Sequence, residues 1–238
     1  YNYYQGTNPF SDVPAWAAPY VAACAANGIT SGIGGGMYGA GQNVNAVQAA
    51  LMMLKALGYF QYQEDFGGDY VLATVKQATE ARLFDGIDSN AQQALTRNEV
   101  AQMALNALKA DMVSFTGDVG IELPNVGNVG YKSEYTPRTS TDPKYNRLID
   151  NKHSSDIDHS GQYYCQLGEE LYNGDLVQRY DSDIFERPSY TWTYKTELIG
   201  TYVDKAKLLA SYTSGVSGRT LYDLLNNITL RDYDLEVY

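Results

Sequence analysis

Residues 96–108 read Thr-Arg-Asn-Glu-Val-Ala-Gln-Met-Ala-Leu-Asn-Ala-Leu, and this stretch sets the fold of the first half of the chain. Thr96 and Glu99 have the spacing of a capping box, in which each side chain binds the backbone N–H of the other residue. An apolar stripe with helical spacing follows, at Val100, Met103, Ala104 and Leu108. We therefore expect a helix that begins at this box.

The same pattern occurs 51 residues upstream. Residues 45–48, Asn-Ala-Val-Gln, form a weaker capping box, and residues 49–57 align with residues 100–108. Five positions coincide: Ala50 with Ala101, Met52 with Met103, Leu54 with Leu105, Ala56 with Ala107 and Leu57 with Leu108. The alignment predicts two equivalent helices in an internal repeat.

The residues before each of these helices also correspond, now with a shift of 54. This shift pairs Trp16 with Tyr70, Val21 with Val75, Ile29 with Leu83, Gly32 with Gly86 and Ile33 with Ile87. The difference between the two shifts places a change of loop length within residues 34–42, a Gly-rich stretch where insertions are tolerated. Each repeat is thus expected to form a helix, a loop and a second helix.

The start of the first helix has two interpretations. Ser11 or Asp12 can cap it, with Pro14 in the first turn. Pro19 lies inside the same run, so it either kinks the helix or the regular part begins only near Ala17.

From Val113 onward tyrosine, threonine, aspartate and glycine dominate, and helix formers are scarce. Alternation at Tyr190, Trp192 and Tyr194 predicts a strand with these rings on one face. Further strands are expected at residues 163–167, 199–203 and 230–238, and a short helix at residues 220–226. We expect an α+β protein with a tail at 1–8, repeats at 9–60 and 61–112, and a β-rich domain at 113–238.

Composition excludes several classes of function. The chain has 238 residues, 17 of them Lys or Arg and 28 Asp or Glu, so its formal charge is −11. This acidity argues against nucleic acids and anionic membranes as partners, because both attract basic surfaces. With two His and two Cys, a centre built on several such ligands is not expected, and neither is a cofactor. No apolar run is long enough to span a membrane. Because the chain begins with Tyr1 and not Met, we expect a processed or trimmed product.

Both repeats resemble the S-layer homology repeat. The first contains Phe10-Ser11-Asp12-Val13, Trp16, Asn27-Gly28-Ile29-Thr30-Ser31-Gly32 and Tyr38-Gly39. The second contains Phe66, Leu83-Phe84-Asp85-Gly86-Ile87 and Leu95-Thr96-Arg97-Asn98-Glu99. The resemblance extends over residues 9–110.

The resemblance implies a bacterial cell-surface module. In this family three repeats form a pseudo-threefold bundle whose grooves bind an anionic, often pyruvylated, secondary cell-wall polysaccharide. An Arg in the family's Thr-Arg-x-Glu motif contacts the acidic sugar, and Arg97 matches it, with Thr96 and Glu99 holding the helix start. A guanidinium suits this role because its fork pairs with a carboxylate. The sequence departs from the pattern in having Ala46 where the first repeat would carry its Arg, and no third repeat.

The candidate polysaccharide ligands are Asp12, Trp16, Thr96, Arg97 and Glu99. Asp12 is either a groove residue or a helix N-cap, and the cap is the favoured interpretation. Trp16 either stacks on a sugar or packs in the core with Tyr20 and Cys24, which follow it at intervals of four; the core is favoured. Arg97 either binds the sugar acid or is an exposed residue of the first helical turn.

A weak calcium-loop pattern occurs at Asp156, Asp158 and Ser160, whose oxygens alternate ahead of a Gly. The twelfth position is Leu167, where a calcium loop needs a bidentate Glu. We therefore favour a solvated loop and expect no metal site.

Cys24 and Cys165 have two interpretations. In an extracellular protein they can form a disulfide that closes a long loop. Cys24 is equally suited to be a small buried apolar residue of an Ala-rich helix.

The 22 tyrosines have two competing uses, a carbohydrate platform or contacts with neighbouring copies of the protein. Residues 166–202 are also similar to a region that follows paired repeats in surface proteins of gut Firmicutes. We expect a non-enzymatic, extracellular protein on the surface or wall of a Gram-positive bacterium, with cell-wall polysaccharide as its partner. The alternative is a self-assembling subunit of a surface layer or filament. A glycan hydrolase with paired carboxylates is a third class, since Asp and Glu are plentiful.

Overall fold

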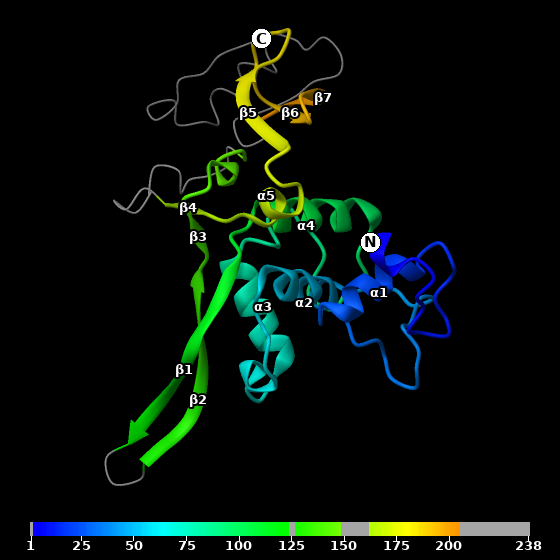
Figure 1. The fold of residues 1–238 in the computed structure, drawn as a ribbon, viewed down its shortest axis with the longest axis vertical. Coiled ribbons are helices and arrows are strands. Elements are labelled where there is room, and N and C mark those ends of the chain that lie inside the picture. Colours follow the sequence, from blue (N-terminus) through cyan, green and yellow to red (C-terminus); the bar gives the residue numbers. More distant parts are fainter. Residues whose placement is uncertain (1, 124–126, 149–161, 205–238) are drawn as a thin grey trace, which may run out of the picture. The chain divides into compact units, whose positions relative to one another are not determined.

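The structure is a computed structural model that describes residues 2–123, 127–148 and 162–204 (Figure 1). It consists of two compact units, Tyr1–Gly174 and Asp175–Tyr238. The helix expected at residues 220–226 and the strand expected at residues 230–238 lie outside the described residues.

The first unit contains the helices of the chain's described part. They are the 3-10 helix η1 (Asn2–Tyr4), α1 (Ala18–Ala26), α2 (Ala46–Leu57), the 3-10 helix η2 (Gln63–Phe66), α3 (Tyr70–Glu80), α4 (Arg97–Lys109), the 3-10 helix η3 (Pro143–Tyr145) and α5 (Leu167–Leu171). The order α1, loop, α2 is followed by α3, loop, α4. Two successive helix–loop–helix units are therefore present, at the positions that the internal alignment predicts.

Local sequence explains where α2 and α4 begin. Both predicted capping boxes form: the Asn45 side chain accepts the N–H of Gln48 at 2.9 Å, and Thr96 accepts the N–H of Glu99 at 3.3 Å. In α1 the regular helix starts at Ala18, which places Pro19 in the first turn, where it costs no hydrogen bond. The second of the two interpretations of Pro19 is thus correct.

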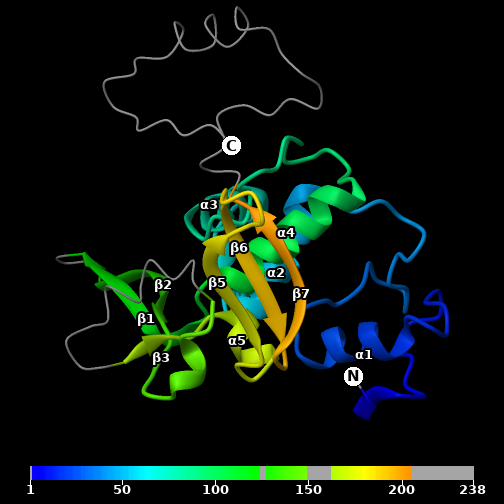
Figure 2. The ribbon, with the colours of Figure 1, turned by 90° about the horizontal axis from the view of Figure 1, so that it is seen from above.

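The core of the first unit lies between α2, α3 and α4. Leu54, Leu57, Leu83 and Met103 are each 0% exposed and pack together with buried alanines of all three helices. α2 packs against both α3 and α4. Figure 2 shows α2 next to α4. Burial of each large apolar side chain contributes about 1.5–3 kcal/mol, so this cluster is a main source of stability.

The two helix–loop–helix units are also joined by backbone hydrogen bonds. The N–H of Leu95 donates to the carbonyl O of Val44 at 3.0 Å, and the N–H of Val47 donates to Ala91 at 3.2 Å. The equivalent residues before α2 and α4 therefore run antiparallel and hold the two helix starts in register.

The first unit extends beyond residue 112, where the sequence predicts a domain boundary. β1 (Val113–Leu123) and β2 (Gly127–Pro137) form an antiparallel hairpin, and β3 (Thr139–Ser140) pairs with β4 (Tyr163–Tyr164). The N–H of Met112 donates to Cys165 at 2.8 Å, and the N–H of Leu167 donates to Ala110 at 3.1 Å. These bonds connect residues 110–112 to the segment that leads into α5. The boundary of the first compact unit therefore lies at Gly174 and not at residue 112.

Gly58 shows how closely the strands approach the helices. It ends α2 with a φ of 107°, and a Cβ at this position would lie 2.4 Å from the carbonyl O of Val113. A residue with a side chain is excluded here by both the backbone conformation and the contact.

The second unit contains a three-stranded antiparallel sheet in the order β5 (Leu176–Ser182), β6 (Pro188–Tyr194), β7 (Glu197–Val203). Tyr190, Trp192 and Tyr194 alternate along β6 opposite Tyr180, Gln178 and Leu176 of β5, so the predicted strand and its aromatic face are present. The strand expected at residues 163–167 is wrong beyond Tyr164, because the chain turns into α5. The structure confirms the α+β class.

Candidate functional site

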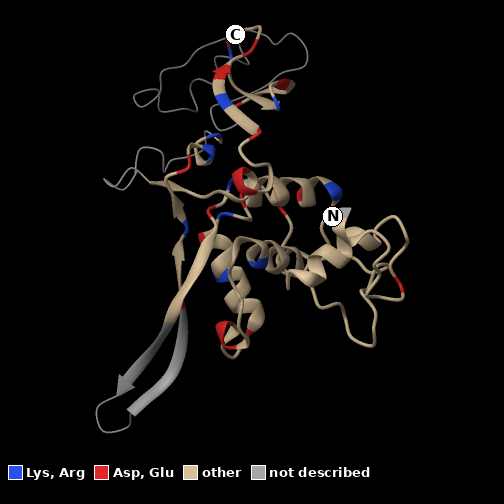
Figure 3. Ribbon diagram, viewed as in Figure 1, with Lys and Arg blue, Asp and Glu red and all other residues tan. Residues whose placement is uncertain are grey.

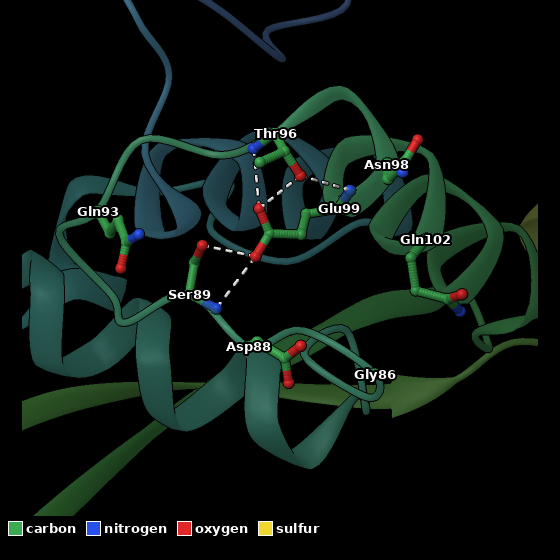
Figure 4. Close-up of a pocket in the computed structure, with 8 residues that line it drawn as sticks. All are labelled: Gly86, Asp88, Ser89, Gln93, Thr96, Asn98, Glu99 and Gln102. Atoms are coloured by element: carbon green, nitrogen blue, oxygen red, sulfur yellow. Dashed lines mark hydrogen bonds between the residues drawn. The ribbon is translucent and has the colours of Figure 1, made fainter.

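A cavity of about 500 Å³ lies at the start of α4 (Figure 4). It is lined by Gly86, Asp88, Ser89, Gln93, Thr96, Asn98, Glu99 and Gln102. The lining comes from the loop before α4 and from its first two turns, and apart from Gly86 every lining residue has a polar side chain. Such a cavity suits a hydrophilic ligand with several hydroxyl groups.

Glu99 forms the centre of the hydrogen bonding in this cavity. Its carboxylate accepts the N–H and the hydroxyl of Ser89 at 3.0 and 2.5 Å, and the N–H and hydroxyl of Thr96 at 2.8 and 2.7 Å. Hydrogen bonds from Ser89, followed by those from Thr96, lower the pKa of Glu99 to about 2. The side chain is therefore ionised at neutral pH and fixes the loop to the helix start.

The remaining polar side chains around Glu99 are available for a ligand. Asn98 and Asp88 are exposed at the rim, and Figure 4 shows both pointing away from the Glu99 carboxylate. The Gln102 amide donates to Asn106 at 2.9 Å, which fixes its orientation on α4. The cavity thus offers carboxamide and carboxylate groups to a ligand, around the hydrogen-bonded Glu99 side chain.

Arg97 lies beside this cavity but is not part of its lining. It is the first residue of α4 and is exposed. Within the described part of the chain, no hydrogen bond or ion pair holds its guanidinium. Of the predicted ligand residues, the structure therefore brings Thr96 and Glu99 into one cavity, with Arg97 next to it in the chain.

Asp12 holds a different loop. Its carboxylate accepts the backbone N–H groups of Tyr38, Gly39 and Ala40 at 2.6, 2.7 and 3.0 Å. The hydrogen bond from Tyr38 is the main cause of a lowered pKa of Asp12. The favoured interpretation of Asp12 as a helix cap is wrong, because α1 begins six residues later and its N-cap is Ala17.

The expectation that Trp16 packs in the core is also wrong. It is 77% exposed, and it lies ahead of α1 and not within it. The face that α1 buries carries Ala18 and Ala22 instead, and Tyr20 is half exposed. Neither Asp12 nor Trp16 lines the cavity at α4.

The two cysteines do not form the possible disulfide. Both are free thiols: Cys24 is half buried on α1, and Cys165 is 1% exposed between β4 and α5. Cys165 is instead held by its backbone, whose N–H donates to Arg138 at 2.9 Å.

Asp156, Asp158 and Ser160, the candidate calcium loop, lie outside the described residues. In the part that is described, no group of three or more His, Cys, Asp or Glu side chains is placed to hold a metal ion. The same residues include no helix of the length and apolarity that crossing a membrane requires.

Comparison with known families identifies one segment of the chain. Residues 9–45 match the S-layer homology domain. This S-layer homology segment contains α1, Asp12 and Trp16, covers less than half of the chain, and associates the protein with the cell surface. No curated protein and no solved structure matches the chain.

Charge distinguishes the S-layer homology segment from the rest of the molecule. Asp12 is its sole charged residue, and Figure 3 shows the ribbon around α1 almost free of blue and red. The segment contains no Lys, Arg or His, so it offers no cation to an acidic ligand. The cavity and Arg97 both lie beyond the segment, in the second helix–loop–helix unit.

Sequence reasoning missed Ser89, the residue that binds Glu99. No spacing in the sequence pointed to it, because Ser89 lies ten residues before Glu99, in the loop where the two repeats differ in length.

Proposed function

We propose that this protein is a non-enzymatic component of the surface of a Gram-positive bacterium, and that its helical repeats bind secondary cell-wall polysaccharide. The second helix–loop–helix unit is, in this proposal, a second S-layer homology repeat. The match at residues 9–45 supports the surface location. The polar cavity at the start of α4, next to Arg97, supports the binding of a glycan.

The observation that carries the proposal is the combination of this cavity with an exposed guanidinium. Thr96 and Glu99 line the cavity, and Arg97 between them projects from the same helical turn. Polar lining groups bind sugar hydroxyls, and the guanidinium pairs with an acidic substituent through two parallel hydrogen bonds.

The acidic character of the chain makes Arg97 essential to this proposal. With a formal charge of −11, the protein as a whole repels an anionic polymer. The cavity itself carries two carboxylates, Asp88 and Glu99, and no cation. Binding of an acidic glycan therefore requires the local charge of Arg97, and salt should weaken it because the group is exposed.

A binding assay on purified wall polymer tests the proposal. We expect the parent protein to bind and Arg97→Ala to bind about tenfold more weakly or worse, equivalent to ~1.4 kcal/mol. Arg179→Ala is the matched control, since Arg179 is an exposed arginine of β5 in the second unit. Failure of the parent protein to bind, or equal binding by both arginine variants, would contradict the proposal.

Self-association is a second candidate function, and the second unit supports it. Large apolar side chains are exposed there: Ile184 is 91%, Leu198 66%, Phe185 61% and Tyr202 56% exposed. Among the described residues, β7 pairs only with β6 and so presents an edge. Exposed apolar groups next to a strand edge are typical of contacts between copies.

Sedimentation velocity over a range of protein concentrations, together with electron microscopy, tests this candidate. We expect the parent protein to form oligomers or polymers and Leu198→Lys to shift the distribution toward monomer. Ile33→Lys, at a half-exposed apolar position of the first unit, serves as the control. A monomer at all concentrations would rule out self-association.

A further inference from the structure

Strand β7 forms one edge of the three-stranded sheet of the second unit. Within the described residues its outer side pairs with no other strand, and Figure 2 shows it as the last strand of the order β5, β6, β7. An unpaired edge is a template for another strand, because its N–H and C=O groups can continue the hydrogen-bond ladder. One residue of β7, Ile199, is skipped in the pairing with β6 and forms a bulge. The regular part of this edge is therefore residues 200–203.

The side chains of this regular part are exposed on both faces of the sheet. Tyr202 lies opposite Tyr190 on one face, and the Thr201 hydroxyl is hydrogen-bonded to that of Thr191 at 3.0 Å on the other. Tyr202 is 56% exposed and Thr201 is exposed too. A strand that packs against this edge would therefore bring side chains next to them on both faces.

Charge distinguishes β7 from the other edge strand of the sheet. β5 carries Arg179 and Asp181, which are both exposed, whereas residues 198–203 of β7 include no charged side chain. Charged side chains on an edge strand oppose its pairing with a further strand. Of the two edges, β7 is thus the one that can accept a partner strand.

The charges nearest to this stretch lie at its two ends. Lys195 and Glu197 are at its start, and Asp204, which follows β7, is 6% exposed. If a second β7 pairs antiparallel, the two Glu197 carboxylates lie at opposite ends of the strand pair, each with Lys195 of its own turn close by in sequence. Antiparallel pairing therefore does not bring these two carboxylates together.

The partner that fits this edge is a second copy of the chain. Antiparallel pairing of two identical strands is self-complementary, because a twofold axis gives both copies the same contacts. The formal charge of −11 makes two copies repel each other, so their contact is least unfavourable where charged side chains are absent. Residues 198–203 provide such a stretch.

We propose that two copies of the chain pair through β7, antiparallel and around a twofold axis, so that their three-stranded sheets join into one continuous sheet. Tyr180, Tyr190 and Tyr202 lie opposite one another across the three strands of each copy, and the pairing extends this row toward the partner. The inference rests on self-association, the second candidate function, and assigns the surface responsible for it.

Amide hydrogen exchange of the full chain at low and high protein concentration, with sedimentation velocity on the same samples, tests this pairing. We expect exchange in β7 to slow by about tenfold or more as the dimer forms, because its outer N–H groups gain acceptors. Exchange in β5 should not change with concentration, since that edge stays free of a partner.

Tyr202→Lys and Tyr180→Lys are matched variants. The two tyrosines flank Tyr190 from opposite edges of the sheet and are 56% and 46% exposed. Tyr202→Lys should weaken dimerisation about tenfold or more, and Tyr180→Lys should leave it unchanged. Circular dichroism checks that both variants are folded, and Ile199→Lys provides a second variant of β7 with the same expected direction.

Three results would overturn the pairing while leaving self-association through another surface possible. These are dimers without slower exchange in β7, equal weakening by the two tyrosine variants, and slow exchange in β7 at every concentration, which would mean that the edge is covered within one chain. A monomer at all concentrations would instead contradict self-association itself, and this pairing with it.

Discussion

The carboxylate of Asp12 accepts the backbone N–H of Tyr38 at 2.6 Å, across 26 residues of chain. Glu99 accepts the N–H of Ser89, which lies in the loop that leads to α4 in the second helix–loop–helix unit, at 3.0 Å. In both units a carboxylate ties down the loop that leads to the second helix. At the position equivalent to Glu99 the first unit has Gln48, whose side chain accepts the backbone N–H of the N-cap residue Asn45 at 3.1 Å. In the first unit the loop is bound instead by the carboxylate of Asp12, which comes from another part of the chain.

Replacement of Asp12 by Asn should release the loop at residues 38–40. The amide of Asn has one carbonyl oxygen in place of two carboxylate oxygens, and it bears no charge to strengthen the three hydrogen bonds. We expect amide hydrogen exchange of Tyr38 and Gly39 to accelerate by about tenfold or more. The Ser89 amide is the internal control, because it is bound by Glu99; equal acceleration at both loops would contradict a local role.

Glu99→Gln should lower stability in a pH-dependent manner. The pKa of Glu99 is lowered from 4.5 to about 2 in the folded protein, so its stabilising effect is fully present above pH 4.5. The effect is lost as pH falls from 4.5 through 2, because the folded state must then take up the proton. We expect the difference in Tm between parent and variant to be largest near pH 7 and to close over this range. A difference that does not change with pH would contradict the assignment.

Tyr135→Phe should loosen the attachment of the β1–β2 hairpin to the helices. The Tyr135 hydroxyl donates to Asp65 and accepts the N–H of Gln61 at 3.1 Å, and both partners lose a hydrogen bond when it is removed. Burial, followed by the hydrogen bond to Asp65, raises the pKa of Tyr135, so the phenol stays protonated at neutral pH. We expect a loss of about 1–3 kcal/mol in the free energy of unfolding, measured with urea. Tyr70→Phe, at an exposed tyrosine of α3, should change it by less than about 0.5 kcal/mol.

Leu54→Ala should lower the stability of the core formed by α2, α3 and α4. Leu54 is 0% exposed in the middle of α2, so the substitution leaves a cavity among α2, α3 and α4 and should cost about 2–5 kcal/mol. Leu72→Ala provides the comparison, because Leu72 is 67% exposed on α3 and its loss should change stability by about 0.5 kcal/mol or less. Similar losses at both positions would argue against the described core.

The sequence by itself determined the elements whose causes are local. Thr96 with Glu99 and Asn45 with Gln48 fix the starts of α4 and α2 through hydrogen bonds within one helical turn. The alternation around Trp192 likewise determines a strand with one aromatic face. Such features are readable because the interacting groups are close in sequence.

Only the tertiary structure decided the partners that are distant in sequence. The contact of Asp12 with Tyr38, the exposure of Trp16 and the inclusion of residues 113–174 in the first unit depend on how separate segments meet. Periodicity specifies which face of a helix is apolar, but the free energy of burial depends on which other segment covers that face, and no spacing within the helix encodes this.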